Sequence, residues 1–277
     1  MKSVTVYQIE ESKQGDVEGI DFDQAFESLK FTPCGNLDLR RDGFIETPCG
    51  ELATRLMGAT HFVYQREDKI LPASVIKDHV EEKIKVIFDQ EGRRVSRKER
   101  GGIKDEIIFE LLPRAFTRKS QVPCFIAGGK IFIGTSSANR AEEIISKVRE
   151  ALGSFPCLPI ERVNLDELAR NGEDGKIIAQ EKIKLVQVKG EATSTNKHLP
   201  VDSAEITALM DSGMSVEEIG ILYDDKFSAT YTAGRVLKSF KLSDDIKDQA
   251  SDGCETTAEL WQNTQVLIAG ALGDFYV

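Results

Sequence analysis

The side chains with the clearest potential for chemistry form a basic run near the middle of the chain. Six of the positions between 93 and 104 are basic and one is acidic. The basic residues of this run are Arg93, Arg94, Arg97, Lys98, Arg100 and Lys104. Ammonium and guanidinium groups bind phosphate oxygens and release the counterions condensed on a nucleic acid. The run therefore indicates a site for a polyanion, and the alternative interpretation is a solvated loop between two helices.

Two smaller basic groups follow along the chain. They are Arg114, Arg118 and Lys119, and then Lys182, Lys184, Lys189 and Lys197. The chain of 277 residues has a net charge of −10, yet residues 77–201 carry 23 basic and 19 acidic residues. Because the binding of a polyanion depends on local potential and not on overall charge, we expect the middle of the chain to hold the phosphate contacts.

The other reactive residue types form no recognisable catalytic pattern. The sequence contains no GxxxxGK[ST], no GxSxG, and no GxGxxG after a strand. His61, His79 and His198 are far apart and lack the spacing of zinc ligands. Asp224-Asp225 and Asp244-Asp245 are candidates for a two-metal nuclease, but such neighbours at turns and helix starts are usually solvated caps. We therefore expect no metal and no cofactor.

Cysteine usage and hydropathy indicate a cytoplasmic protein. The five cysteines are Cys34, Cys49, Cys124, Cys157 and Cys254, and none forms a CxxC pair. Their odd number favours buried thiols over a disulfide framework. No window approaches the ~18 apolar residues of a membrane span, and the first residues lack the apolar stretch of a secretory signal.

Two amphipathic helices are predicted on either side of the basic run. Apolar residues recur at helical spacing in 75–88, and a second set extends from Ile103 to Leu112, before the helix-stopping Pro113. These patterns predict a helical arm whose loop or helix ends carry positive charge.

The remaining segments mix strands with amphipathic helices. Strands are predicted at 2–10, 42–46, 60–65, 122–127, 130–135 and near 177–188, with a three-stranded meander between 219 and 240. Helices are predicted at 22–29, at 137–152, after position 203 and after Thr256. Gly128-Gly129 predicts a type I′ hairpin, and Pro123 places the strand before it at a sheet edge or at its own start. The polar segment 163–200 predicts a short helix, one strand and a linker.

This mixture predicts an α+β fold, because regular βαβ alternation is absent. We expect a discontinuous central region at 1–70 and 121–162. The helical arm with its basic loop would occupy 71–120. A C-terminal α+β region with the meander and terminal helix would occupy 163–277.

Several short segments between residue 30 and the end of the chain form one ordered pattern. They are Phe31–Gly35, Lys69–Pro72 with Val75–Lys77, Lys104–Glu106, Leu111–Arg118, Leu152–Ser154, Ser203–Thr207 and Ala271–Gly273. The Leu-Leu-Pro-Arg-Ala-Phe stretch, with Lys-Ile-Leu-Pro upstream, is the most specific of them. In this order the segments resemble the RdgC family of recombination-associated DNA-binding proteins.

The resemblance implies a multi-part, elongated subunit that closes into a ring-shaped homodimer. Duplex DNA would pass through a positively charged hole, with little sequence preference. The family would restrain the RecA recombinase by occupying DNA, which implies a nucleoid-associated protein in the cytoplasm. The missing catalytic pattern gives no support to the exonuclease label that some descriptions of this family carry.

Two residues match family positions linked to DNA binding and ring contacts. The resemblance implies that Arg114 contacts DNA and that Phe116 is an anchor at a dimer contact, with a place in the core as the alternative for Phe116. A Lys-Gln pair of the family is replaced here by Lys197-His198 and the residues after it, so that contact is not preserved.

The sequence thus predicts a non-enzymatic, sequence-independent binder of double-stranded DNA that acts as a homodimer. The predicted DNA contacts are Arg93, Arg94, Arg97, Lys98, Arg100, Lys104, Arg114, Arg118, Lys119, Lys189 and Lys197. One alternative is a metal-dependent exonuclease that uses the same ring as a clamp. A second alternative is an interaction module that blocks RecA directly.

Overall fold

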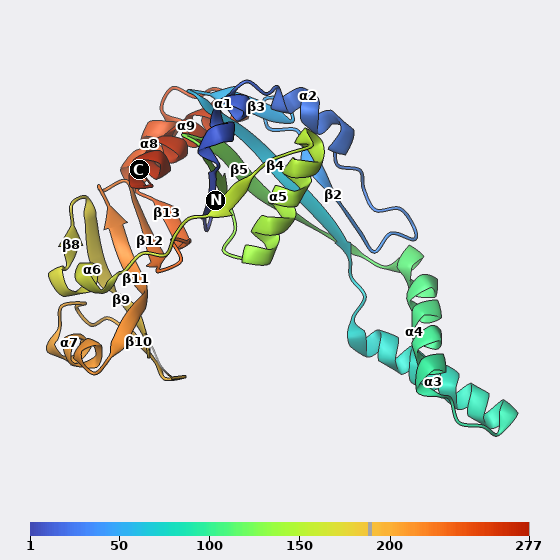
Figure 1. Ribbon diagram of the computed structural model, residues 1–277. Helices are drawn as coiled ribbons and strands as arrows, with labels where there is room; N and C mark the ends of the chain where they lie inside the picture. The colour runs from blue at the N-terminus through green and yellow to red at the C-terminus, as the bar shows by residue number, and fades with distance from the viewer. Residues whose placement is uncertain (188–189, 277) are drawn as a thin grey trace. The chain divides into compact units, whose positions relative to one another are not determined.

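The computed structural model describes residues 1–187 and 190–276, and this part of the chain has an α+β architecture (Figure 1). Within the described residues, the chain forms two antiparallel sheets and nine α-helices. The predicted α+β class is therefore confirmed. Lys189, one of the predicted DNA contacts, lies outside the described residues.

The first sheet has the strand order β2-β4-β5-β6-β1-β7, and β3 pairs with β4. Its strands are β1 (Thr5–Ile9), β2 (Arg40–Ile45), β3 (Ala53–Leu56), β4 (Ala59–Lys69), β5 (Thr117–Ala127), β6 (Lys130–Ile133) and β7 (Cys157–Pro159). The β5–β6 turn has φ values of 54° at Gly128 and 70° at Gly129, which only glycine adopts readily. The predicted hairpin with positive φ at both turn residues is confirmed.

The second sheet has the strand order β10-β9-β11-β12-β13, with β8 on β9. Its strands are β8 (Glu173–Asp174), β9 (Ile177–Gln187), β10 (Thr193–Lys197), β11 (Met214–Tyr223), β12 (Phe227–Thr232) and β13 (Leu237–Leu242). The predicted meander corresponds to β11, β12 and β13. The linker that we expected at the end of the 163–200 segment is wrong in part, because 193–197 form the edge strand β10.

The helices follow the predicted amphipathic segments and add short ones that the pattern missed. They are α1 (Glu11–Glu18), α2 (Phe22–Phe26), α3 (Ala73–Glu91), α4 (Arg97–Leu111), α5 (Ala138–Leu152), α6 (Asp166–Asn171), α7 (Ala204–Asp211), α8 (Asp244–Ser251) and α9 (Thr257–Phe275). Short 3-10 turns cover Glu27–Leu29 and Leu112–Arg114. Thr256 and Glu259 form the capping box that begins α9.

The chain divides into two compact units, which we call the core unit and the hairpin unit. The core unit consists of Met1–Ser28, Glu46–Val63 and the chain from Val122 onward. The hairpin unit consists of Leu29–Ile45 and Tyr64–Gln121, and it contains α3 and α4. The boundary falls within the long strands β4 and β5.

The core unit is held by one continuous apolar cluster that includes residues of both sheets and α9. Phe125 stacks on Phe132 with ring centroids 4.3 Å apart, and Phe132 meets Tyr276 edge-on at 5.9 Å. Phe275 lies 5.0 Å from the ring of Tyr231, on the apolar face of β12. Burial of these large rings gives the second sheet one dry face and leaves its other face polar.

Two local predictions need correction. Pro123 lies inside β5, which runs between β4 and β6, so it is neither in an edge strand nor at a strand start. The carbonyl of Pro123 accepts a hydrogen bond from Gly134 N, just beyond the end of β6, so the missing donor falls at the end of this ladder. All five cysteines are free as expected, but only Cys124 is fully buried.

Candidate nucleic-acid interface

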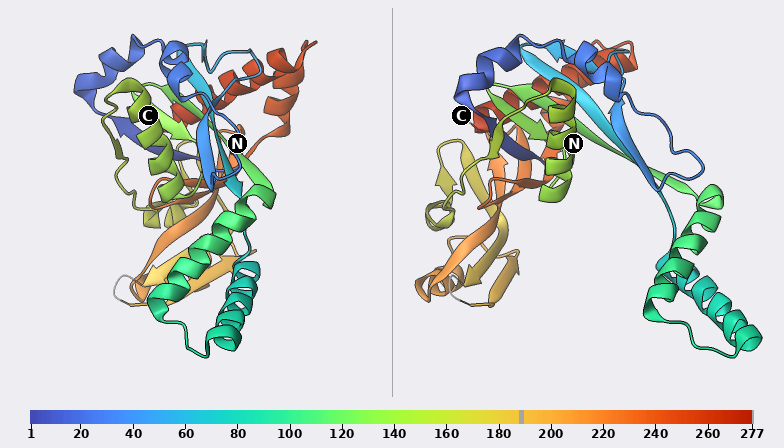
Figure 2. Two further views of the ribbon diagram at one scale, coloured as in Figure 1. Left: turned by 90° about the vertical axis from the view of Figure 1, so that its right-hand side faces the viewer. Right: turned by 45° about the vertical axis from the view of Figure 1, so that its right-hand side comes forward.

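The predicted basic arm is a hairpin of two packed helices, α3 and α4 (Figure 2). Val80, Ile103 and Ile107 are buried between them. Gly92 ends α3 with φ 65°, and its N–H bonds to the carbonyl of Phe88. This left-handed residue turns the chain into the short connection that leads to α4.

The second helix of the hairpin begins earlier than its apolar positions indicate. Ser96 caps α4 by accepting a hydrogen bond from Glu99 N, and the Glu99 carboxylate accepts one from Ser96 N. This capping box places Arg97, Lys98 and Arg100 in the first turn of the helix and not in a loop. Of the two places that we expected for the positive charge, the loop holds Arg93 and Arg94, and the start of the second helix holds Arg97, Lys98 and Arg100.

Positive side chains in a first helical turn oppose the positive end of the helix dipole, at roughly 0.3–1 kcal/mol each at low ionic strength. The same arrangement attracts an anion, because free backbone N–H groups and cations then point toward one region.

Arg93 is already occupied by carboxylates. Its Nη2 lies 2.6 Å and its Nη1 2.8 Å from the two oxygens of Glu99, and its Nε bonds Glu91 at 2.5 Å. These bonds raise the pKa of Arg93 and lower the pKa of Glu99. Arg100 is more loosely engaged, because its Nη2 lies 3.7 Å from Glu81. Because carboxylates partly neutralise Arg93 and Arg100, both attract an anionic ligand less strongly than an unpaired arginine would.

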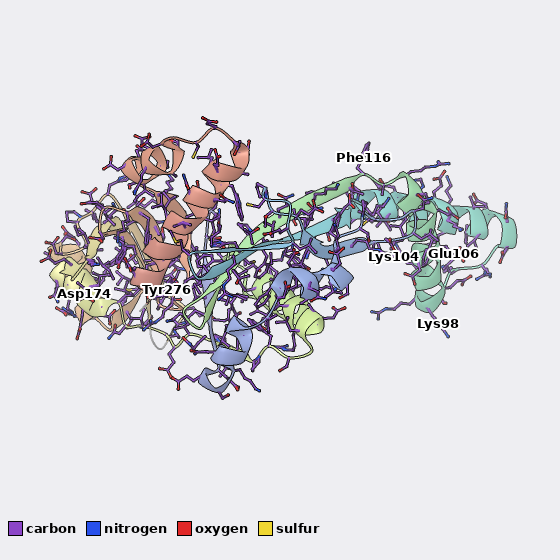
Figure 3. All side chains as sticks on the ribbon, turned by 90° about the horizontal axis from the view of Figure 1, so that it is seen from above. Lys98, Lys104, Glu106, Phe116, Asp174 and Tyr276 are labelled. Carbon is purple, nitrogen blue, oxygen red and sulfur yellow. The ribbon has the colours of Figure 1, made fainter. Side chains whose placement is uncertain are left out.

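Six other predicted contacts make no ion pair within the residues that the structure describes. They are Arg94, Arg97, Lys98, Lys104, Arg114 and Arg118, and all of them are exposed. The labelled side chains of Lys98 and Phe116 project outward from the ribbon of the hairpin unit (Figure 3). A surface with this many unneutralised cations fits a partner that carries closely spaced negative charge.

Phe116 is 84% exposed, which excludes the core alternative for this side chain within the single chain. Its backbone is held nonetheless, because its carbonyl accepts a 2.7 Å hydrogen bond from Ile70 N. Pro113 belongs to the 3-10 turn that ends α4, so Arg114 lies at the helix end as expected. A solvent-exposed aromatic ring whose backbone is fixed by a hydrogen bond is typical of a residue that anchors an interface.

Lys119 is also exposed, and it differs from the six cations above in having an aromatic ring beside it. Its Nζ is 5.9 Å from the ring centroid of Phe31. The nearby Glu67 carboxylate is buried, and its pKa is lowered mainly by the Cys34 backbone N–H, which donates to it at 2.7 Å. Lys119 lowers the pKa of Glu67 further. The position of Lys119 therefore supports a role in holding the Phe31–Cys34 loop.

The structure also contains a pocket in the hairpin unit that the sequence pattern did not indicate. It has a volume of about 400 Å³ and lies between α3 and α4. Its apolar wall includes Leu71, Ile76 and Val80, and its basic rim includes Lys77 and Lys104. Alternation of apolar and basic residues at helical spacing was the available signal, but it is shared by any amphipathic helix.

The third basic group lies in the second sheet of the core unit. Lys197 is exposed in the edge strand β10, directly opposite Lys182 of β9. Lys182 and Lys184 point to the polar face, where Lys182 Nζ bonds Thr230 and Lys184 Nζ lies 3.9 Å from Glu218.

The candidate carboxylate pairs lie at turns and helix starts, as expected of caps. Asp224 pairs with Lys226 at 3.0 Å, which lowers its pKa, and Asp225 follows it with φ 52°. Asp244 pairs with Lys247 in the first turn of α8, which likewise lowers its pKa. Across 1–187 and 190–276, no three His, Cys, Asp or Glu residues form a group that could hold a metal.

None of the helices in the described part of the chain is long and apolar enough to cross a membrane.

Comparison with known proteins gives a consistent result over the full chain. The family model described as "RdgC: Putative exonuclease, RdgC" matches residues 1–277. A Shewanella oneidensis protein is 30% identical over 258 residues, which is 89% of this chain and 84% of that protein. A Psychromonas ingrahamii protein is 28% identical over 263 residues, which covers 91% and 86%. A Halorhodospira halophila protein is 30% identical over 241 residues, which covers 83% and 80%. All three relatives are named "Recombination-associated protein RdgC".

Proposed function

The chain belongs to the RdgC family of recombination-associated proteins, and on that premise we propose that it binds double-stranded DNA without sequence preference. In this proposal the protein acts as a homodimer that encircles the duplex, and it limits the access of RecA to DNA.

The observation that carries the proposal is the set of cations without carboxylate partners in the described part of the hairpin unit. Each phosphate contact contributes about −0.9 to the slope of log K against log salt for duplex DNA. Six contacts, one for each of the exposed cations named above, correspond to a slope of about −5 for each engaged subunit. These contacts are made to the phosphates of the DNA backbone, so they carry no sequence information.

The homodimer is supported by Phe116. Its ring is 84% exposed, and a partner that covered it would bury a large apolar surface at the centre of a contact. The apolar pocket between α3 and α4 offers a receptor of suitable chemistry in the same unit, so two copies could exchange the contact about a two-fold axis. In such a dimer, Phe116 of each subunit occupies the pocket of the other, and no anchor or pocket is left open.

Competition for DNA is the simplest route to an effect on RecA. A ring or clamp on the duplex would occupy the substrate without any contact with the recombinase. Inhibition of RecA that survives removal of the hairpin cations would instead favour direct blocking of RecA by a protein surface.

The test is fluorescence anisotropy with a random-sequence labelled duplex, without magnesium, at several salt concentrations. We expect binding that is indifferent to sequence and that falls with salt. The variant R94Q/R97Q/K98Q should reduce the magnitude of the slope by about 2.7 for each engaged subunit, since each phosphate contact accounts for about 0.9 of it.

The matched control for this test is R162Q/R170Q/K247Q, which removes the same charge from the core unit. Its three cations are already paired with Glu217, Asp211 and Asp244. We expect its slope to equal that of the wild type. Absence of binding by the wild-type protein at low salt would refute the proposal.

A second candidate function is suggested by the description of the matching family model, which names an exonuclease. Incubation of an end-labelled duplex with the protein and magnesium separates the two functions. Progressive loss of the labelled end would favour the nuclease, and an intact duplex would favour binding alone.

A further inference from the structure

The turn between β12 and β13 holds Arg235 in a backbone conformation that is rare for its residue type. Its φ is 57°, in the left-handed region that glycine adopts freely and that other residues adopt at a cost. Arg235 N donates to the carbonyl of Thr232 at 2.8 Å, which closes the turn. The carbonyl of Arg235 accepts a hydrogen bond from the hydroxyl of the buried Tyr276, at 2.6 Å. These bonds fix the direction in which the Arg235 side chain leaves the backbone.

The side chain of Arg235 is partly buried and has no counter-charge. Its Nε is closed to solvent and has no hydrogen-bond partner among the described residues. In the same part of the chain, no carboxylate forms an ion pair with its guanidinium group. A buried donor that is left unpaired costs free energy, and the cost is larger when the group is charged. Two unfavourable features therefore coincide at this residue, and a ligand that pairs with the guanidinium would offset them.

Arg235 lines a pocket of about 190 Å³ that lies wholly within the core unit. The other lining residues come from the segment Val163–Asn171, which contains α6, from β8, and from Ile177 and Tyr231 of the second sheet. Leu168 is 6% exposed and belongs to the apolar cluster, so one wall of the pocket is part of the core. Pockets for drug-sized ligands measure roughly 300–1,000 Å³, so this one has the size for a molecule such as an amino acid.

Two further hydrogen-bond donors line the pocket with Arg235. Burial raises the pKa of Tyr231, and Arg235 is close enough to lower it in part, so the Tyr231 hydroxyl stays protonated and can donate. Its ring is held edge-on by Phe275, with the centroids 5.0 Å apart. Asn164 Oδ1 accepts a hydrogen bond from Asp166 N at 2.9 Å, which leaves the amide NH₂ of Asn164 as a donor. A guanidinium, a phenol and an amide NH₂ together match the oxygens of a carboxylate.

Three carboxylates line the same pocket. They are Glu167 on α6 and Glu173 and Asp174 on β8, of which Figure 3 labels Asp174. All three are exposed, and across 1–187 and 190–276 none of them forms an ion pair with Arg235 or with another cation. The pocket therefore presents unpaired groups of both signs. Because the carboxylates outnumber the arginine, the pocket favours a ligand with more cationic than anionic groups.

We propose that this pocket binds a free α-amino acid with a cationic side chain, such as lysine, ornithine or arginine. The α-carboxylate pairs with Arg235 and Tyr231, and the methylene groups lie along the apolar wall that includes Leu168. The amino groups, or the guanidinium of arginine, pair with the carboxylates of α6 and β8. Those carboxylates repel a phosphate or a second carboxylate, so the site selects against nucleic acid and dicarboxylates. It is independent of the proposed binding of DNA.

Isothermal titration calorimetry of the full chain, without DNA, tests the proposal. The probes are L-lysine, L-ornithine and L-arginine, and we expect one saturable site per chain for at least one of them. Cadaverine lacks the carboxylate of lysine, and hexanoate lacks both ammonium groups. Each should bind at least about tenfold more weakly, because hydrogen bonds to charged groups are lost. Absence of binding by all three amino acids at about 10 mM, well above the usual range of substrate affinities, would overturn the proposal.

Arg235→Gly separates a binding role from a structural one. The change removes the partner of the ligand carboxylate, and it also removes the left-handed arginine and its unpaired guanidinium. We expect the affinity for the amino acid to fall by at least about tenfold. The melting temperature of the free protein should stay the same or rise, as it does when a group kept for binding is removed. Unchanged affinity in this variant would contradict the proposal.

E173Q/D174N tests the other end of the pocket, and it decides the question if Arg235→Gly folds poorly. Both side chains are exposed, so the melting temperature should not change. The affinity for the amino acid should fall by about fivefold at low ionic strength, since two exposed ion pairs are lost. D252N/E255Q is the matched control, because it removes two exposed carboxylates of the same unit that do not line the pocket. It should bind as the wild type does.

The remaining outcomes also decide the matter. If E173Q/D174N binds the amino acid as tightly as its control, the ligand lies elsewhere on the chain and the proposal is wrong. Equal binding of cadaverine and lysine would also refute it, since the carboxylate would then make no contact. Because no DNA enters the assay, failure here leaves the proposed function standing, and failure to bind duplex leaves this inference standing.

Discussion

The small core of the helical hairpin makes Ile107→Ala an informative variant. Ile107 is 3% exposed and forms a buried cluster with Val80 and Ile103. The change removes three carbon atoms, which corresponds to about 2.4 kcal/mol at about 0.8 kcal/mol per buried methylene. The cavity left behind brings the expected loss to about 2–5 kcal/mol.

We expect this loss to appear as local opening of the hairpin, because a cluster of three buried residues holds α3 against α4. Since 1.4 kcal/mol is a factor of ten in an equilibrium, a loss of about 3 kcal/mol raises the open population roughly 100-fold. Amide exchange in α3 and α4 should accelerate by that factor, while β1, β6 and β11 exchange at the wild-type rate. The affinity for duplex should fall with the folded fraction of the hairpin.

Hydrogen exchange read by mass spectrometry resolves the two units. Phe109→Ala is the matched control, because Phe109 lies on the same helix and is 58% exposed. Phe109→Ala should change the free energy of hairpin opening, as derived from the exchange rates, by no more than about 0.5 kcal/mol. A single thermal transition that shifts as a whole for Ile107→Ala, with exchange raised in every strand, would refute independent opening of the hairpin.

Two further predictions concern Phe116 and His61. Phe116→Asp should leave the far-ultraviolet circular dichroism spectrum unchanged, since the ring is 84% exposed, but should shift the protein toward monomer in light scattering. An unchanged dimer would remove Phe116 from the contact. Burial lowers the pKa of His61 to about 4, so the unfolded chain takes up a proton first as pH falls. The free energy of unfolding should therefore be insensitive to His61 above pH 6.5 and decrease by about 3 kcal/mol between pH 6.5 and 4. Urea unfolding of His61→Leu should show a flatter pH dependence in that range, and equal slopes for the two proteins would contradict this account.

Much of the fold follows from local patterns that the sequence displays directly. The stripe of Ala141, Ile144, Ile145 and Val148 predicts α5, and all four residues are buried in it. Gly128-Gly129 predicts the hairpin for a reason of backbone conformation alone. Elements without a hydrophobic period were not predicted correctly. The first turns of α4 are polar and contain two glycines, and β10 consists of Thr-Ser-Thr-Asn-Lys.

The candidate site was predictable in composition but not in geometry. Residue types indicated the cation-rich segments correctly, yet they could not show that Glu91 and Glu99 engage Arg93 while Arg94 makes no ion pair within the described chain. In the second sheet, a register with bulges between β9 and β11 places Lys182 beside Gly220. Such long-range pairing cannot be deduced from the pattern of one segment at a time.

The order of the strands has a consequence for the way the chain is made on the ribosome. β1 lies between β6 and β7, so Thr5 has to wait for Ile133 before it can pair. At about 5–20 residues per second, the stretch from the end of β1 to the start of β6 takes roughly 6–24 s to synthesise. The helical hairpin is contiguous and can fold during this interval. The first strand emerges early with both edges unpaired, and a chaperone that covers it would protect the nascent chain from mispairing.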